Sequence, residues 1–135
     1  MPWDGSRNAG FTTAKPWLPL NADWLIRNVA QMAQEPHSIL ALYRQLLAAR
    51  RTYPALAIGE FALLDAAGDV LTYERRSGAE RLIVALNLGE HSQRLELPDW
   101  ASDWRVLLST VADTAPAGHG AMLLRANEGL ILMAD

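Results

Sequence analysis

The sequence predicts an α+β fold, in which a short N-terminal segment of loop and helix precedes an antiparallel β-sandwich. Two observations predict it. Before about residue 56 the apolar residues recur with the helical period of about 3.6, whereas after Gly59 they alternate with a period of two. In the second part, closely spaced strand-like runs are separated by Gly, Asn, Asp, Ser or Pro, which is typical of antiparallel sandwiches. We therefore divide the chain into residues 1–56 and 57–135.

Residues 1–21 are expected to form a long ordered loop. The stretch has little apolar periodicity but is dense in Trp, Pro, Gly and Asn. Such a backbone has few partners in regular ladders, so it usually lies as a loop over a larger body. A free N-terminus would ordinarily fray, and we therefore expect this stretch to have had further protein in front of it.

Two helices are expected between the loop and the sandwich. Asn21 is the predicted N-cap of a short helix over about 22–33. Ser38 is expected to cap a longer helix that runs to about Thr52. Pro54 stops this second helix, because the residue before a proline is forced out of the helical region. One apolar stripe runs along the second helix: Ile39, Leu40, Tyr43, Leu46 and Leu47.

The strands of the sandwich are expected from the period-two runs after Gly59. They are placed at 60–65, 69–76, 80–88, 92–97, 104–110, 121–126 and 129–134. The run over 80–88 is apolar on both faces, so it is expected to lie in the middle of a sheet with both faces covered.

Composition excludes several classes of partner and site. The chain has 135 residues, of which half are apolar, a net charge of −3, one lysine and no cysteine. No basic surface for nucleic acid or anionic lipid is therefore expected, and neither a disulfide nor a thiolate site is possible. No signal peptide and no 18-residue apolar run is seen, so we expect no membrane span and a cytoplasmic location.

Several motifs, taken in order, resemble one known family: Met1-Pro-Trp-Asp-Gly-Ser6, Asn8-Ala-Gly-Phe11, Pro16-Trp-Leu-Pro19, Asn28-Val29, Gln34-Glu-Pro-His-Ser-Ile-Leu40, Tyr43-Arg44 and Arg50-Arg-Thr-Tyr-Pro-Ala-Leu56. They resemble the late barrel loop and the following helix of the α-amylase superfamily, glycoside hydrolase family 13. The resemblance is greatest to its α-glucosidase, oligo-1,6-glucosidase and trehalose synthase branch. The motif matches cover roughly residues 1–90, and the remainder matches by strand pattern.

The resemblance implies an organisation and a chemistry. Residues 1–56 would be the last loop and the end of a (β/α)8 barrel, and residues 57–135 would be the Greek-key sandwich called domain C. The parent enzyme would act on α-linked glucosides by hydrolysis or transglycosylation. It would retain the anomeric configuration by forming a covalent intermediate. Because the family's catalytic Asp, Glu and Asp come from earlier barrel strands, no catalytic residue, cofactor or metal site is expected in this chain.

Two groups of residues are candidates for sugar contacts. By the resemblance, the loop residues Trp3, Asp4, Asn8 and Phe11 would lie near the substrate entrance, although the aromatic rings could instead pin the loop to the barrel. Trp100 and Trp104 flank an acidic turn and could form a carbohydrate-binding platform, because aromatic rings offer flat apolar faces. Packing at the edge of the sandwich is the favoured explanation of this second pair.

The function expected from these observations is that of a non-catalytic accessory domain that supports the barrel of an α-glucosidase-type enzyme. The barrel domain is then the main partner. Two alternatives remain at this point: a stand-alone module that binds α-glucosides, and a self-associating module whose uncovered helix stripe joins copies together. A third alternative is a hydrolase with a cryptic site. We do not expect it, because glycoside hydrolysis needs two suitably placed carboxyl groups and no acidic residue here lies in a context that resembles the family's catalytic motifs.

Overall fold

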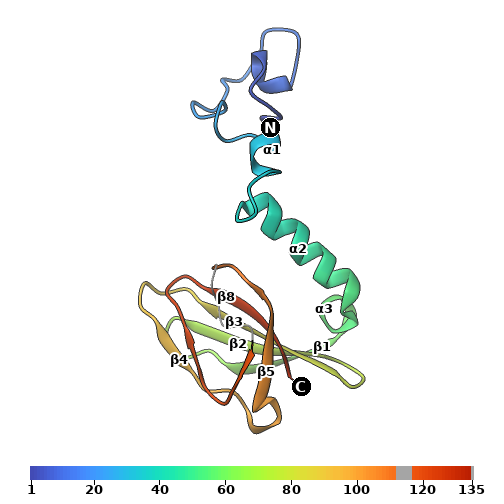
Figure 1. The fold of residues 1–135 in the computed structure, drawn as a ribbon, viewed down its shortest axis with the longest axis vertical. Coiled ribbons are helices and arrows are strands. Elements are labelled where there is room, and N and C mark those ends of the chain that lie inside the picture. The colour runs from blue at the N-terminus through green and yellow to red at the C-terminus, as the bar shows by residue number, and fades with distance from the viewer. Residues whose placement is uncertain (112–116, 135) are drawn as a thin grey trace. The chain divides into compact units, whose positions relative to one another are not determined.

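The computed structural model describes residues 1–111 and 117–134 and divides the chain into two compact units. The N-terminal unit comprises Met1–Gln45 and the C-terminal unit comprises Leu46–Asp135. The boundary falls within helix α2 (Ile39–Thr52), so one continuous helix contributes residues to both units (Figure 1).

The N-terminal unit is mostly loop, and backbone hydrogen bonds hold its start in place. The carbonyl oxygens of Pro2 and Trp3 accept from the N–H groups of Val29 (3.2 Å) and Ala30 (2.9 Å). These N–H groups belong to the first turn of helix α1 (Val29–Met32), where no intrahelical partner exists. The loop is therefore closed on itself by a contact between its two ends.

The predicted helix over 22–33 is largely wrong, because α1 contains only Val29–Met32. Its N-cap is Asn28, not Asn21. The Asn28 side-chain oxygen accepts from the N–H of Gln31 at 3.0 Å, and the Asn28 backbone is extended. Its side-chain amide also donates to two carbonyl oxygens of the preceding turn. The buried Asn28 side chain thus bonds both to the carbonyl oxygens of the preceding turn and to the first turn of α1. The helix therefore begins after Asn28 and does not extend back over residues 22–28.

Helix α2 (Ile39–Thr52) matches the prediction. The Ser38 hydroxyl accepts from the N–H of Ala41 at 3.1 Å and donates to the carbonyl oxygen of Met32 at 2.6 Å. Beyond α2 the chain forms a further short helix that was not predicted, α3 (Pro54–Ile58), in which the proline occupies the first position. Proline is well suited to that position because its missing N–H is one that has no helical partner there.

The C-terminal unit is an antiparallel β-sandwich. Its described strands are β1 (Glu60–Asp65), β2 (Val70–Ser77), β3 (Glu80–Asn87), β4 (Gln93–Leu95), β5 (Asp103–Ser109), β6 (Ala117–His119), β7 (Met122–Leu124) and β8 (Gly129–Ala134). Six of them form one sheet in the order β1-β2-β3-β8-β5-β6, and β4 and β7 form a second. All pairings are antiparallel.

Strand β3 has the central place that its sequence predicts. It lies between β2 and β8, and four successive residues of it, 82–85, are buried. Since successive side chains of a strand point to opposite faces, both faces of β3 are covered. Strand β8, which follows all its neighbours in sequence, pairs with both β3 and β5 (Figure 1). This non-consecutive order shows that the sheet is not a simple succession of hairpins.

The hydrophobic core lies where the two sheets face each other. It is a cluster of Ile83, Ala85, Leu95, Ala101, Trp104, Leu124, Leu130 and Leu132. Strands β3 and β8 supply its floor, and β4 and β7 supply one residue each from the second sheet. The short second sheet therefore covers this core on one side through Leu95 and Leu124.

Two short elements of the sandwich were also not predicted: strand β6 (Ala117–His119) and the 3-10 helix η2 (Asp99–Ala101). Strand β6 has no apolar alternation, and it is a strand only because it pairs with β5. Its central Gly118 lies against the Trp104 ring, where an added Cβ would come within 2.5 Å of a ring carbon. Packing against a neighbour, and not local pattern, defines this strand.

Candidate functional site

The N-terminal loop contains a run of left-handed backbone. Asn8, Ala9 and Gly10 have φ angles of 56°, 56° and 65°. Only glycine adopts this region freely, and asparagine does so more readily than most residues. The Asn8 side-chain amide donates to the carbonyl oxygens of Thr12 (3.0 Å) and Ala14 (2.9 Å), which holds the loop in this shape. Asn8 therefore acts as an organiser of the loop.

Asp4 is held in the same loop by Ser6. Its Oδ1 atom accepts from the Ser6 hydroxyl and from the Ser6 N–H at 2.8 Å. Both bonds, the side-chain bond foremost, lower the pKa of Asp4 below its ordinary value. The carboxylate also lies beside Gly10, where an added Cβ would be 2.7 Å from Oδ1. Asp4 is thus an ionised hydrogen-bond acceptor, which suits contact with a sugar hydroxyl but not the role of a general acid.

The aromatic rings of this loop are open to solvent. Trp3 and Phe11 are about half exposed, and the Trp3 N–H donates to the carbonyl oxygen of Ala9 at 2.8 Å. All four predicted loop residues, Trp3, Asp4, Asn8 and Phe11, therefore belong to one hydrogen-bonded loop. Their contact with substrate stays a prediction.

Trp100 and Trp104 do not form an open platform in this structure. Trp104 is only 5% exposed, belongs to the core, and donates its indole N–H to the carbonyl oxygen of Gly120 at 3.0 Å. Trp100 packs on the core, and the Arg81 guanidinium lies 3.4 Å from its ring centroid. The same guanidinium is paired with the buried Glu74 at 2.6 Å. These contacts favour the packing interpretation of the pair.

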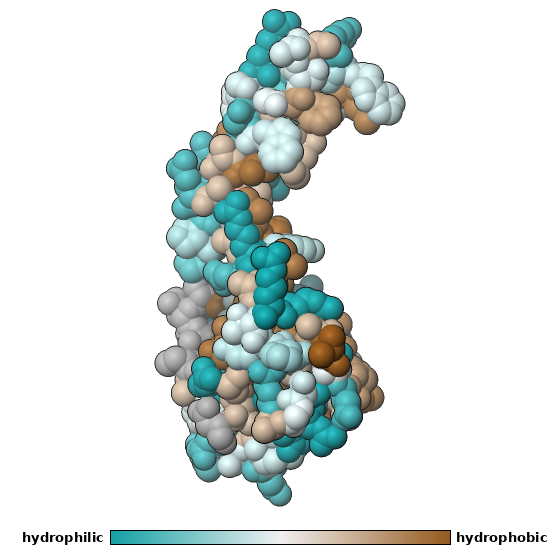
Figure 2. Space-filling model, turned by 90° about the vertical axis from the view of Figure 1, so that its right-hand side faces the viewer, coloured by the Kyte–Doolittle hydropathy of each residue, from teal (hydrophilic) through white to brown (hydrophobic). Residues whose placement is uncertain are grey.

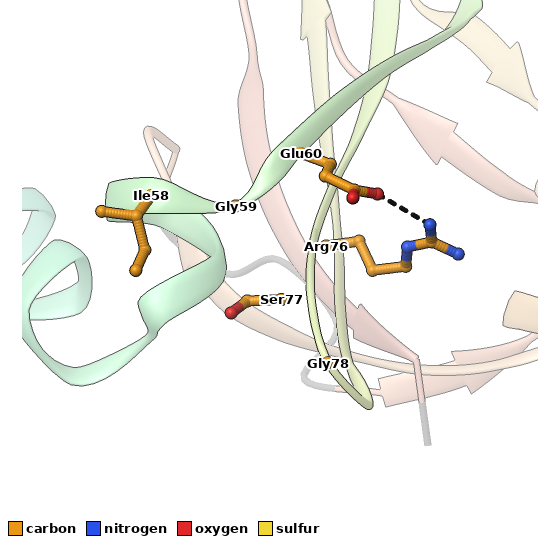
Figure 3. A pocket seen from close by; sticks show the side chains of 6 residues that line it. All are labelled: Ile58, Gly59, Glu60, Arg76, Ser77 and Gly78. Atoms are coloured by element: carbon orange, nitrogen blue, oxygen red, sulfur yellow. Dashed lines mark hydrogen bonds and ion pairs between the residues drawn. The ribbon is translucent and has the colours of Figure 1, made fainter.

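A shallow pocket of about 390 Å³ lies where α3 meets β1. It is lined by Ile58, Gly59, Glu60, Arg76, Ser77 and Gly78. Glu60 and Arg76 face each other across β1 and β2 and form an ion pair of 2.7 Å, and Ile58 lies on the other side of Gly59 (Figure 3). The sequence alone does not reveal this ion pair, since only the strand register places Glu60 opposite Arg76.

Helix α2 exposes most of its predicted apolar stripe. Ile39, Tyr43 and Leu47, spaced four residues apart on one face, are 65%, 62% and 51% exposed. No residue of α2 is buried. The N-terminal unit likewise exposes Trp17, Leu18, Leu25 and Ile26, and Figure 2 shows brown, hydrophobic side chains at its surface. So many exposed apolar side chains are characteristic of a surface that contacts other protein.

Residues 1–111 and 117–134 contain neither a cluster of metal-ligating side chains nor a membrane-spanning helix. No group of three or more His, Cys, Asp or Glu side chains is placed to hold a metal ion. No helix there is long and apolar enough to cross a membrane. His119, the one histidine with an acidic partner among the described residues, has Nδ1 2.9 Å from Asp103 Oδ1 on an exposed part of β5 and β6.

Two family models match the chain in succession. The catalytic domain of α-amylase matches residues 1–59, and a domain of unknown function, DUF3459, matches residues 57–129. They meet close to Gly59, where α3 ends and β1 begins.

Relatives and solved structures agree with these models. The chain is 41% identical to an oligo-1,6-glucosidase of Heyndrickxia coagulans over 84% of its own length and 20% of that protein. It is 38% identical to an amino acid transporter heavy chain of Rattus norvegicus, over 98% of its length and 21% of that protein. The structure superimposes on the trehalulose synthase MutB of Pseudomonas mesoacidophila with a TM-score of 0.87 at 32% identity, over 99% of this chain and 24% of that one.

The chain thus spans about a fifth of the curated relatives that it matches. The two models and the relatives together account for both units: the N-terminal part matches the catalytic domain, and the sandwich matches the domain that follows it. The chain belongs to the α-amylase superfamily, glycoside hydrolase family 13, and resembles the C-terminal region of its α-glucosidases.

Proposed function

We propose that this chain is a non-catalytic accessory part of an α-glucosidase-type glycoside hydrolase, and that its partner is the catalytic barrel. The observation that carries the proposal is the exposed apolar stripe of α2 within residues that match the α-amylase catalytic domain. A helix normally buries such a stripe against a neighbouring element. The barrel is the neighbour that this match supplies.

The charged groups of the N-terminal loop support a non-catalytic role. Glycoside hydrolysis needs one carboxyl group to protonate the leaving oxygen and a second to attack or to activate water. Asp4 is ionised and fixed by Ser6, so it cannot hold the proton that the first role requires. We infer that the chain shapes the approach to a site whose acid and nucleophile lie in the barrel.

The parent activity is inferred from the relatives. Oligo-1,6-glucosidase and trehalulose synthase are both named for reactions of glucosyl linkages. We propose that the parent hydrolyses or transfers α-linked glucose. The amino acid transporter heavy chain, which matches nearly the whole chain, provides a contrast, because a similar sequence also occurs in a protein that is named for another role.

Fragment complementation tests the accessory role. The H. coagulans oligo-1,6-glucosidase is produced without the fifth that this chain matches, and is then mixed with the purified chain. We expect the two to co-purify and the mixture to cleave a chromogenic α-glucoside that neither cleaves alone. Cleavage by this chain alone would overturn the proposal, as would a failure to bind the truncated enzyme.

A pair of variants locates the contact. Leu47→Glu places a charge on the α2 stripe and is expected to abolish co-purification. Gln45→Glu adds the same carboxylate to an exposed residue outside the stripe and is expected to leave it unchanged. Equal binding by the two variants would show that the stripe is not the docking surface.

Self-association is the second candidate, favoured by the same exposed side chains. Without a barrel, two copies of the chain would bury the α2 stripe against each other. Analytical ultracentrifugation of the purified chain would then show a dimer that Leu47→Glu converts to a monomer. A monomer at high concentration would leave the barrel as the only proposed partner.

A further inference from the structure

Helix α3 is too short to keep its shape without support from other elements. It contains five residues, Pro54–Ile58, and begins with a proline that has no backbone N–H. Isolated helices of fewer than about 12 residues are marginal in water, so packing must stabilise this one. Ala55, its second residue, is completely buried. The residues that contact α3 therefore determine where it lies.

Two side chains of one β-hairpin bind both backbone groups of Ala55. Glu80, at the start of β3, accepts from the Ala55 N–H through Oε1 at 2.7 Å. This N–H lies in the first turn of α3, where no intrahelical acceptor exists. Arg75, on β2, donates from Nε to the Ala55 carbonyl oxygen at 3.0 Å. Strands β2 and β3 pair along their whole length, so both contacts come from one ordered element.

The face of the sheet that carries these two side chains is covered by α3. Arg75 lies opposite Leu82, which is two residues from Glu80, so the three side chains share one face. Leu82 is completely buried, although it does not belong to the core cluster between the two sheets. Helix α3 contacts both β2 and β3. The helix is thus held on the sandwich by apolar and polar contacts together.

A third side chain connects α3 to the end of α2. Arg50 Nη1 donates to the carbonyl oxygen of Leu56 at 3.0 Å, and Nη2 donates to that of Ala57 at 3.5 Å. These carbonyl groups belong to the last turn of α3, where intrahelical donors are missing and a cation is favourable. The bend between α2 and α3 is therefore fixed by a side-chain contact as well as by the chain itself.

We propose that the sandwich orients the end of α2 by way of α3, and that Glu80, Arg75 and Arg50 are the positioning residues of this joint. The sandwich holds α3, and α3 holds residues 46–52 of α2, the part that carries Leu47. The sandwich thereby keeps Leu47 in the orientation in which the barrel can bind it. This last step rests on the proposed function, whereas the joint itself does not.

Spin-label distances measure the joint on the whole chain. The chain has no cysteine, so Ala48→Cys on α2 and His91→Cys on the sandwich place one label each, both at exposed residues of the C-terminal unit. Pulsed electron paramagnetic resonance gives the distribution of distances between the two labels. We expect one narrow distribution in the labelled chain. Glu80→Ala and Arg50→Ala are each expected to abolish it and to produce a broad one.

Two control variants separate positioning from folding. Glu80→Gln keeps an acceptor oxygen for the Ala55 N–H, so it is expected to retain the narrow distribution. Glu60→Ala removes an exposed carboxylate beside the joint that is paired with Arg76, and it is expected to change nothing. Tryptophan fluorescence in urea reports whether the sandwich stays folded. Arg50→Ala, at an exposed residue of α2, keeps the test decisive if Glu80→Ala lowers the urea midpoint.

Affinity for the truncated oligo-1,6-glucosidase tests the consequence for docking. If Glu80→Ala leaves about one orientation in ten competent, its apparent affinity falls about tenfold, while Glu80→Gln and Glu60→Ala bind as the unmodified chain does. Unchanged distances in both alanine variants would overturn the joint. Broad distances with unchanged affinity would overturn its part in docking. If the unmodified chain fails to bind, the proposed function is wrong, and the distances still decide whether the joint exists.

Discussion

Gly59 shows how closely two segments approach at the junction of α3 and β1. A Cβ atom on this residue would lie 2.4 Å from the carbonyl oxygen of Ala55 and 2.7 Å from that of Arg76. Both are backbone atoms, so neither can turn aside as a side chain would. Its φ of −63° is ordinary, and the requirement for glycine is therefore one of space.

We predict that Gly59→Ala lowers the free energy of unfolding by about 2 kcal/mol, because the clash must be relieved by moving backbone. Urea denaturation followed by tryptophan fluorescence measures it. Gly5→Ala is the matched control, since nothing lies within 4 Å of a Cβ there, and it should change the value by less than about 0.5 kcal/mol. Equal stability of the two variants would show that the α3–β1 junction is looser than described.

Asp4 gives the N-terminal loop a pH dependence with a definite sign. The pKa of its carboxyl is lowered by hydrogen bonds from Ser6, so the charged form is favoured in the folded loop. The loop's stabilisation by these bonds is therefore complete above the ordinary carboxyl pKa of about 3.9, and is lost as the pH falls through the lower folded value. At neutral pH the loop is unaffected by small changes in pH.

We predict that Ser6→Ala returns the pKa of Asp4 towards its ordinary value, because the largest cause of the shift is the Ser6 side chain. Titration of the Asp4 side-chain resonance by nuclear magnetic resonance measures it. Thr13→Ala, a nearby exposed hydroxyl outside this contact, should leave the titration where it is. A Ser6→Ala titration identical to that of the unmodified chain would contradict the assignment.

At the scale of elements, the sequence predicted correctly those helices and strands whose formation depends on their own residues. The start of α2 was predicted from Ser38, and β3 from its unbroken apolar run. Both rest on bonds or burial that the residue types themselves dictate. Helix α1 was mispredicted because the Asn28 amide bonds backwards to the turn, an interaction that a periodic pattern does not reveal. Strand β6 could not be predicted, since only its pairing with β5 makes it a strand.

Ser38 bonds to both α1 and α2, so loss of its hydroxyl is expected to destabilise both helices. Its hydroxyl caps α2 through the Ala41 N–H and donates to the carbonyl oxygen of Met32 in α1. We predict that Ser38→Ala destabilises the N-terminal region by about 1 kcal/mol, whereas Ser38→Thr, which keeps a capping hydroxyl, retains most of the stability. Loss of helical circular dichroism on heating provides the measurement. Coincident melting of the alanine variant and the unmodified chain would refute it.

At the scale of the molecule, burial is distributed unevenly between the two units. Every residue of the core cluster lies in the C-terminal unit, whereas Ala9 is the only buried apolar residue described in the N-terminal unit. A Trp- and Pro-rich loop cannot build a core of its own, which accounts for the small buried area of the N-terminal unit. The sequence did not indicate the strand order, since pairing of β8 between β3 and β5 depends on the closure of the whole sandwich.

We predict that hydrogen exchange of the isolated chain separates the two units. Amides of residues 1–45 should exchange through low-energy openings, while those of β3 and β8 should exchange only on global unfolding, because burial determines the cost of opening. Exchange followed by mass spectrometry resolves the two. Binding of the truncated oligo-1,6-glucosidase should then slow exchange in α2. Equal protection of both units in the isolated chain would show that the N-terminal unit is stable by itself.

The position of β8 has a consequence for folding during synthesis at the ribosome. Translation delivers β1, β2 and β3 first, and these strands can pair as they emerge. Strand β8, which pairs with both β3 and β5, is synthesised after all of them. Until then the facing edges of β3 and β5 have no partner strand. A premature stop that removes only this segment would leave both strands without their shared neighbour. Such a product is expected to be a client of chaperones and proteases, although nearly all of the sandwich has been synthesised.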